Sequence, residues 1–183
     1  MLNNRRKLIR SCSDADAQKS LLKCTVTSTE RGSFGPVLHV QSKRTSKTLK
    51  PQSYVVKQIQ LGRFSSSFRQ EIVNEIRVVA SLHHPQLVTT WQVKLTPKHI
   101  YIFTEACTGG NLHTRFPYSE RQAKDILRQI LQALLYIHKR GYIHKGLTVS
   151  YVQKSRCPFV LTILPMRTSS LVRKGFVSVN PKL

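Results

Sequence analysis

Glu75 is a carboxylate that the sequence predicts on the buried face of a helix. The side chains of that face recur at steps of four and three residues, which is the spacing of one helical side. They are Phe68, Ile72, Glu75, Val79 and Leu82. A buried carboxylate is costly unless a cation pairs with it. The stripe therefore predicts a basic side chain facing Glu75.

The carboxy-terminal part of the sequence contains no acidic residue. Asp125 is the last of the eight acidic residues, so residues 126–183 contain none. Carboxylates are common general bases and the preferred protein ligands of Mg²⁺. This stretch can therefore supply neither a carboxylate base nor a carboxylate ligand for a metal ion.

The cysteine pattern also bears on metal binding and on location. Cys12, Cys24, Cys107 and Cys157 are scattered, without a Cys-x-x-Cys pair. This spacing argues against a zinc site and against a disulfide framework, and it favours a reducing interior. No apolar run approaches the roughly 20 residues of a membrane span. We therefore expect an intracellular, cytoplasmic protein with no membrane span.

The charge balance is strongly basic, with 30 Lys and Arg against 8 Asp and Glu and a formal net charge of +22. Such a field attracts nucleic acid, anionic membrane surfaces or acidic proteins before any specific contact forms. The basic residues are spread along the chain, with modest clusters at 5–7 and 43–44. No aromatic residues are interleaved with them to stack on bases. Any nucleic-acid binding is therefore expected to be nonspecific.

The elements that must position these residues begin with strands. Residues 1–20 are polar and charged and predict a flexible basic arm. Alternating and β-branched segments predict strands farther along the chain. They cover residues 21–40, as two strands around a turn at 31–35, and then residues 54–60, 87–93 and 99–105.

Two helices are predicted from periodicity and capping. The first opens on Ser67 and Gln70, which match a capping box, and ends before Pro85. The second opens on the same box at Ser119 and Gln122 and extends to about residue 138. Its apolar face is continuous and consists of Ala123, Leu127, Ile130, Leu134 and Ile137.

This order of elements resembles the amino-terminal lobe of a protein kinase followed by the start of its carboxy-terminal lobe, over about residues 21–152. The phrase at residues 73–82 is particularly similar to the NimA-related Ser/Thr kinases. The resemblance implies an α+β fold, with a five-stranded antiparallel small lobe, one helix and a partial helical large lobe. It divides the chain into the flexible arm 1–20, a small lobe 21–107, a partial large lobe 108–165 and a degenerate activation-segment-like tail 166–183.

The resemblance also implies a nucleotide site. Residues 32–37 are similar to the glycine-rich loop that passes over the phosphates, but Glu30 stands at its first glycine, where a carboxylate would repel a triphosphate. Lys57 resembles the lysine that contacts the α- and β-phosphates, and Glu75 its helix partner. Thr104 takes the gatekeeper position. The implied nucleotide-binding residues are Gly32, Gly35, Val37, Val55, Lys57, Glu75, Thr104, Glu105 and Cys107.

The catalytic loop of the resembled family is degenerate here. Its His-Arg-Asp-Leu-Lys-x-x-Asn signature falls on residues 144–151. Gly146 replaces the catalytic aspartate, Thr148 the phosphate-contacting lysine and Tyr151 the metal-binding asparagine. The magnesium-binding Asp-Phe-Gly falls on residues 164–166, which read Leu-Pro-Met. The resemblance therefore implies no catalytic residue, no metal site, weak ATP binding and no requirement for Mg²⁺.

These expectations favour a catalytically inactive pseudokinase with a scaffold or regulatory role. An active Ser/Thr kinase of NimA-related type, phosphorylating proteins with ATP, is one alternative, and a basic protein that binds nucleic acid or acidic surfaces is another. The chain lacks the helices that cover the 119–138 helix in the resembled family. Its apolar face would then be exposed, which predicts a protein partner or self-association. A decayed gene product without any partner fits the same residues.

Overall fold

The computed structural model describes residues 8–32, 35–43, 52–115, 117–144, 147–154, 159–161 and 171–173. The chain divides into two compact units. The first unit contains residues 1–83 and 88–107, and the second contains residues 84–87 and 108–183. The first unit thus ends at the residue where the sequence places the end of the small lobe.

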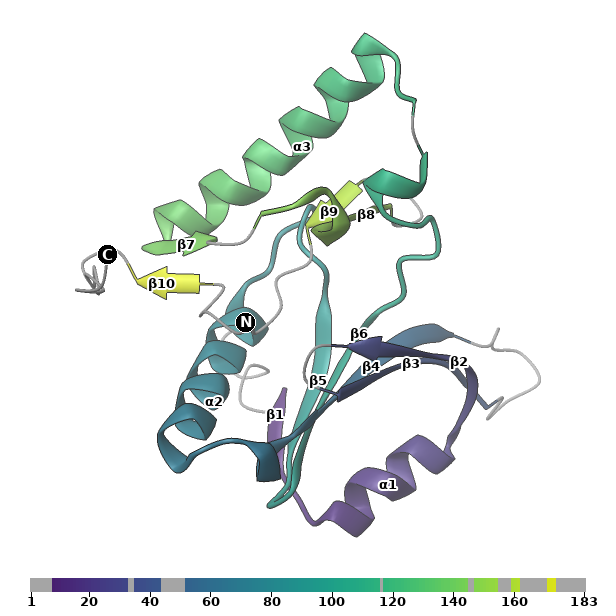
Figure 1. The fold of residues 1–183 in the computed structure, drawn as a ribbon, viewed down its shortest axis with the longest axis vertical. Helices are drawn as coiled ribbons and strands as arrows, with labels where there is room; N and C mark the ends of the chain where they lie inside the picture. The colour runs from purple at the N-terminus through teal and green to yellow at the C-terminus, as the bar shows by residue number, and fades with distance from the viewer. Residues whose placement is uncertain are drawn as a thin grey trace. The chain divides into compact units, whose positions relative to one another are not determined.

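The first unit is built on a six-stranded sheet (Figure 1). Across the sheet the strand order is β1-β5-β6-β4-β3-β2. β1 pairs with β5 in parallel, and the other neighbouring strands are antiparallel. In chain order the strands are β1 (Ile9–Ser11), β2 (Cys24–Gly32), β3 (Gly35–Ser42), β4 (Ser53–Gln60), β5 (Thr90–Leu95) and β6 (His99–Glu105).

The α+β prediction is confirmed, but the expected five antiparallel strands with one helix are wrong in detail. The segment predicted as a flexible arm supplies the sixth strand, β1, and a helix, α1 (Asp14–Leu22). Two backbone hydrogen bonds hold this segment to the sheet edge. Val93 N–H donates to the Leu8 carbonyl at 2.8 Å, and Cys12 N–H donates to the Leu95 carbonyl at 2.9 Å.

Helix α1 was missed because its polar composition conceals a cap and a single inward side chain. Ser13 precedes the helix, and its hydroxyl accepts a hydrogen bond from the Asp16 N–H at 3.1 Å. Such a cap satisfies a donor that would otherwise be left without a partner at the helix start. Ala17 is completely buried, so a small residue brings the helix close to the sheet.

Helices cover the sheet on both faces (Figure 1). Helix α2 (Ser66–Ser81), which follows the short 3₁₀ turn η2 (Leu61–Arg63), lies on one face and α1 on the other. The core of the α2 face consists of Ile59, Leu61, Ile72, Ile76, Ala80, Val93, Ile100 and Ile102. The core of the α1 face consists of Ala17, Cys24, Val40, Val56, Tyr101 and Phe103.

Helix α2 begins slightly earlier than predicted. Its cap is Ser65, whose hydroxyl accepts from the Phe68 N–H at 3.4 Å, and not Ser67. Three consecutive serines made the capping position ambiguous. The fully buried helix residues are Ile72, Ile76 and Ala80. Glu75 precedes one of them and is only partly buried, so the inward stripe is centred one residue away from the predicted one.

The second unit contains helix α3 (Glu120–Lys139) and two small antiparallel sheets. The predicted capping box of Ser119 and Gln122 is confirmed at the start of α3. Leu87, predicted as part of a strand with residues 88–93, instead bridges to Leu161 within this unit. The remaining elements are η3 (Leu112–Arg115), β7 (Tyr142–His144), η4 (Val149–Tyr151), β8 (Val152–Lys154), β9 (Phe159–Leu161) and β10 (Leu171–Arg173).

Candidate functional site

The glycine turn between β2 and β3 is shaped by close backbone approach. A Cβ on Gly32 would stand 2.8 Å from the Gly35 carbonyl oxygen and 2.9 Å from a methyl group of Val37. Gly35 has a φ of +148°, and a Cβ there would collide with the Gln58 carbonyl of β4. Both glycines are therefore needed for the hairpin itself. Ser33 and Phe34 lie outside the described residues.

Four residues form one row across four strands of the sheet. Glu30 on β2 pairs with Val37 on β3, Val37 pairs with Lys57 on β4, and Lys57 pairs with Ile102 on β6. Directly opposed residues of neighbouring strands project their side chains from the same face. Lys57 therefore shares a face with Val37 and with Glu30.

Lys57 is an enclosed cation. Part of the residue remains exposed, but burial of its charged end lowers the pKa of Lys57 to about 8. The negative charges of Cys107 and Glu30 act in the opposite direction and raise this pKa. Burial, reinforced by the charge of Glu105, raises the pKa of Cys107 to about 11. The Cys107 thiol is consequently neutral at pH 7. Of these two groups, only Glu30 carries a negative charge toward Lys57 at that pH.

Glu30 lies close to a neighbour on its own face. Its carboxylate oxygen Oε1 lies 3.0 Å from Nε2 of His39, and 69% of the Glu30 side chain is exposed. The His39 nitrogen is buried and makes no hydrogen bond within the described residues, so this is a close contact and not a hydrogen bond. The carboxylate thus lies at the surface, close to a buried nitrogen of His39.

The expected partner of Lys57 was Glu75. A Lys57–Glu75 ion pair is not found among the salt bridges between described residues. Glu75 lies on α2, whose most buried residues are its neighbours Ile72 and Ile76. The pairing of Lys57 with Glu75 therefore stays a prediction.

The end of β6 supplies the residues expected to face an adenine ring. Thr104 is buried and lies opposite Val55. Glu105 is bound to Thr89 twice: its N–H donates to the Thr89 carbonyl at 3.0 Å, and its Oε1 accepts from the Thr89 N–H at 2.7 Å. Because the Glu105 N–H is occupied by the Thr89 carbonyl, the carbonyl is the backbone group that Glu105 can offer to a ligand. Cys107 closes the first unit.

In the second unit, two residues of the predicted catalytic loop lie close together. The rings of His144 on β7 and Tyr151 on η4 have centroids 6.3 Å apart. Thr148 is exposed and precedes η4. Lys145 and Gly146 lie outside the described residues, as do Leu164, Pro165 and Met166. Within the described parts of the chain, no three His, Cys, Asp or Glu side chains gather as a metal site would require.

A family model of the protein kinase domain matches residues 29–150, which include the glycine turn, the Lys57 strand and most of the predicted catalytic loop. The chain belongs to this family. Three curated kinases illustrate the likeness. A calcium/calmodulin-dependent protein kinase type 1 from Macrobrachium nipponense is 38% identical over 78 residues, which are 40% of this chain and 23% of that protein. Type IV kinases from Mus musculus and Homo sapiens are 39% identical over 77 residues, 40% of this chain and 16% of theirs.

The chain spans less than a quarter of the length of these curated relatives. The residues expected to form its nucleotide site, among them Gly32, Gly35, Lys57 and Thr104, lie in one unit and on one sheet. Among the helices of its described residues, none is long and apolar enough to cross a membrane. Three cysteines, Cys12, Cys24 and Cys107, have free thiols.

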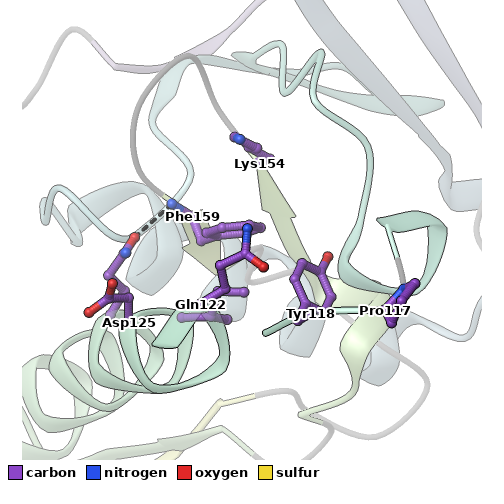
Figure 2. A pocket seen from close by; sticks show the side chains of 8 residues that line it. Pro117, Tyr118, Gln122, Asp125, Lys154 and Phe159 are labelled. Carbon is purple, nitrogen blue, oxygen red and sulfur yellow. Dashed lines mark hydrogen bonds between the residues drawn. The ribbon is translucent and has the colours of Figure 1, made fainter. Parts of the chain in front are cut away.

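The kinase fold also contains a pocket that sequence reasoning missed. It lies in the second unit beside the start of α3 and the β8–β9 hairpin and has a volume of about 330 Å³. In Figure 2, Phe159 stands beside Gln122, with Tyr118 across from them. The Phe159 N–H donates to the Gln129 side chain at 2.7 Å, which fixes one wall. The lining residues are Pro117, Tyr118, Gln122, Asp125, Ile126, Gln129, Lys154 and Phe159.

Nothing in the local sequence pattern marks this pocket. Gln122 reads as a capping residue and Gln129 as a polar position between apolar ones. Lys154 and Phe159 come from a hairpin that is distant in the chain. Its volume lies at the lower end of the range of small-ligand sites, but four of its eight lining residues are polar or charged, more than such sites usually have.

Proposed function

We propose that this kinase-like chain is a pseudokinase: it does not transfer phosphate, it binds nucleotide weakly through its first unit, and it acts as a scaffold or regulator. The observation that carries the proposal is the absence of any acidic residue after Asp125. The kinase match continues to residue 150, which supports the assignment of the catalytic loop to residues 144–151, with Gly146 at the position of the aspartate.

Charge stabilisation supports the loss of catalysis. Phosphoryl transfer depends mainly on positioning the nucleophile and on metal ions that neutralise the transferred group. A chain without the catalytic aspartate and without the carboxylate that holds Mg²⁺ lacks the groups that act specifically in the transition state. Tyr151, at the asparagine position, packs its ring toward His144 and offers a phenol, which is a poor Mg²⁺ ligand.

The retained small lobe supports nucleotide binding. The kinase family binds ATP in general, and here Val37, Val55 and Lys57 lie on one face of the sheet, with Thr104 opposite Val55. An enclosed ammonium at Lys57 attracts an anion because burial has removed much of its hydration. The exposed Glu30 opposes a triphosphate, which makes binding weak.

A thermal melt of the purified chain tests nucleotide binding. The chain is melted alone, with ATP and with ATP plus Mg²⁺, in wild type, Lys57→Met and Lys23→Met, the last being an exposed lysine of the same unit. We expect ATP to raise the melting temperature of wild type and Lys23→Met equally, with or without Mg²⁺, and not that of Lys57→Met. An ATP response that survives in Lys57→Met contradicts the assigned role of Lys57.

A transfer assay tests the absence of activity. Labelled ATP with Mg²⁺ and a general protein substrate should give no incorporation above that of Lys57→Met. Incorporation by wild type that disappears in Lys57→Met would favour the active Ser/Thr kinase instead. The NimA-related subfamily is part of the proposal only through the phrase at residues 73–82; the relatives that match are calcium/calmodulin-dependent kinases.

The partner proposal rests on α3. The predicted exposed face is wrong in part, because Ile137 is completely buried and, of its leucines, only Leu127 is exposed. The exposed apolar stripe consists of Leu127, Leu131 and Leu135, which recur every fourth residue and are 54–56% exposed. Large apolar stripes on a surface commonly mark interaction sites. A protein partner or a second copy of the chain would cover it. Binding to nucleic acid is proposed only as nonspecific charge attraction that disappears with salt.

A further inference from the structure

The negative charge of Glu30 is positioned to affect a ligand that binds beside Lys57. Glu30 is separated from Lys57 by a single intervening strand, through the register Glu30–Val37–Lys57. Neighbouring strands are about 4.8 Å apart, so the two backbones are roughly 10 Å apart, a span comparable to the combined length of the two side chains. A ligand anion that reaches Lys57 on this face therefore comes close to the Glu30 carboxylate.

The Glu30 carboxylate faces solvent and lies close to a side chain of β3 on the same face. His39 approaches its Oε1 to 3.0 Å. His39 shares a face with Val37, two residues before it on β3, so the contact lies on the face that Glu30 and Lys57 share. A Cys107 thiolate would also raise the pKa of Lys57. Burial raises the pKa of Cys107 to about 11, however, so its thiol is neutral at pH 7. Of Cys107 and Glu30, Glu30 is therefore the group whose negative charge acts on Lys57 at pH 7.

We propose that Glu30 takes the place of a ligand phosphate beside Lys57, so that the nucleotide site of the first unit selects uncharged nucleosides of the adenosine class over nucleoside triphosphates. This inference rests on the proposed nucleotide-binding function. The adenosine portion meets Val37 and Val55, which lie on the same face of the sheet in neighbouring rows, while each added phosphate brings negative charge toward Glu30. No carboxylate beyond Asp125 is present to hold a metal ion that would neutralise that charge.

The test is calorimetric titration of metal-free adenosine, ADP and ATP into wild type and Glu30→Gln, which removes the charge and preserves the shape. Glu71→Gln is the matched control because Glu71 is an exposed glutamate of the same unit and the change in net charge is identical. We expect wild type to bind adenosine more tightly than ADP, and ADP more tightly than ATP. Glu30→Gln should strengthen ATP binding by roughly ten-fold and change adenosine binding by less than about two-fold.

The same gain in ATP affinity should shrink at high salt, because the interaction of an exposed carboxylate with phosphate is screened. Glu30→Gly, which restores the residue of the kinase pattern, should behave like Glu30→Gln and serves if that variant does not fold. ATP binding that equals adenosine binding in wild type and is unchanged by both variants would overturn this inference alone. If neither wild type nor Glu30→Gln binds adenosine, ADP or ATP, nucleotide binding itself is overturned and this inference with it.

Discussion

Gly109 and Lys154 touch so closely that no other residue fits at position 109 without movement. A Cβ on Gly109 would stand 2.6 Å from the Lys154 Cβ and 2.7 Å from its carbonyl oxygen. The Gly109 N–H also donates to that carbonyl at 3.0 Å, and the Lys154 N–H donates to the Gly110 carbonyl at 2.9 Å. These contacts attach β8 to the segment after Cys107 and help to define the second unit.

Gly109→Ala should therefore destabilise the second unit. Overpacking against backbone typically costs about 1–3 kcal/mol, and here it also strains a hydrogen bond. Chemical unfolding should show a lower midpoint, whereas Gly62→Ala should change it little because nothing lies within 4 Å of a Cβ at Gly62. Equal stability of the two variants would mean that β8 moves aside without cost.

Lys57→Met should raise stability at neutral pH. Met fills similar space without the buried charge, and we expect a gain of about 1–3 kcal/mol in the free energy of unfolding. In wild type, burial lowers the pKa of Lys57 from 10.5 to about 8. Between these values the unfolded chain binds more protons than the folded one, so wild-type stability rises with pH in this window and the advantage of Met declines.

Urea unfolding of wild type and Lys57→Met at pH 7 and pH 10 measures this effect. Lys23→Met, in which an exposed lysine is removed, should follow wild type at both pH values. A Lys57→Met variant less stable than wild type at pH 7 would show that Lys57 forms a stabilising ion pair, and Glu75 would be the first partner to examine.

Asp14 should make the attachment of α1 to the sheet depend on pH in the acidic range. Its Oδ1 accepts from the Thr96 hydroxyl at 2.6 Å and lies 3.2 Å from the His99 Nδ1. The Thr96 hydrogen bond, and then the contact with His99, lower the pKa of Asp14 below 3.8. A depressed pKa gives stability that is complete above the unfolded value and disappears as pH falls through the folded value.

Asp14→Asn should accordingly reduce stability near pH 6 and flatten the acid side of the stability curve below about pH 4. Hydrogen exchange of β1 and α1 amides should speed up in this variant, since the helix is then attached less firmly. Asp125→Asn, which removes an exposed carboxylate that pairs with Arg128, is the matched control. Unaltered exchange in Asp14→Asn would show that Ala17 packing alone holds α1.

The leucine stripe on α3 should promote association without contributing to folding. Leu131→Gln should change the free energy of unfolding by less than about 0.5 kcal/mol, because the side chain is already exposed. Ile137→Ala, at a fully buried position of the same helix, should cost about 2–4 kcal/mol. Sedimentation at increasing concentration should show wild type associating and Leu131→Gln doing so less. A wild type that stays monomeric throughout would leave a different protein as the only occupant.

Local signals predicted the elements whose chemistry lies within one segment. The α3 capping box is an example, since Ser119 and Gln122 are three residues apart and bond each other directly. Local signals failed where several adjacent residues could serve equally, as at the α2 cap. They failed more seriously for residues 8–22, because the parallel pairing of β1 with β5 joins positions more than 80 residues apart, and no periodicity reports such a partner.

The sequence by itself determined where the acidic residues end and the family to which the chain belongs. The position of Asp125 as the last acid and the order of strand, lysine and helix require no coordinates. Only the tertiary structure shows that Glu30 lies in one row with Lys57 across β3, because this depends on strand register. The same holds for the sixth strand and for the pocket beside α3. Their residues are distant in the chain, and only burial and hydrogen bonding in the folded state bring them together.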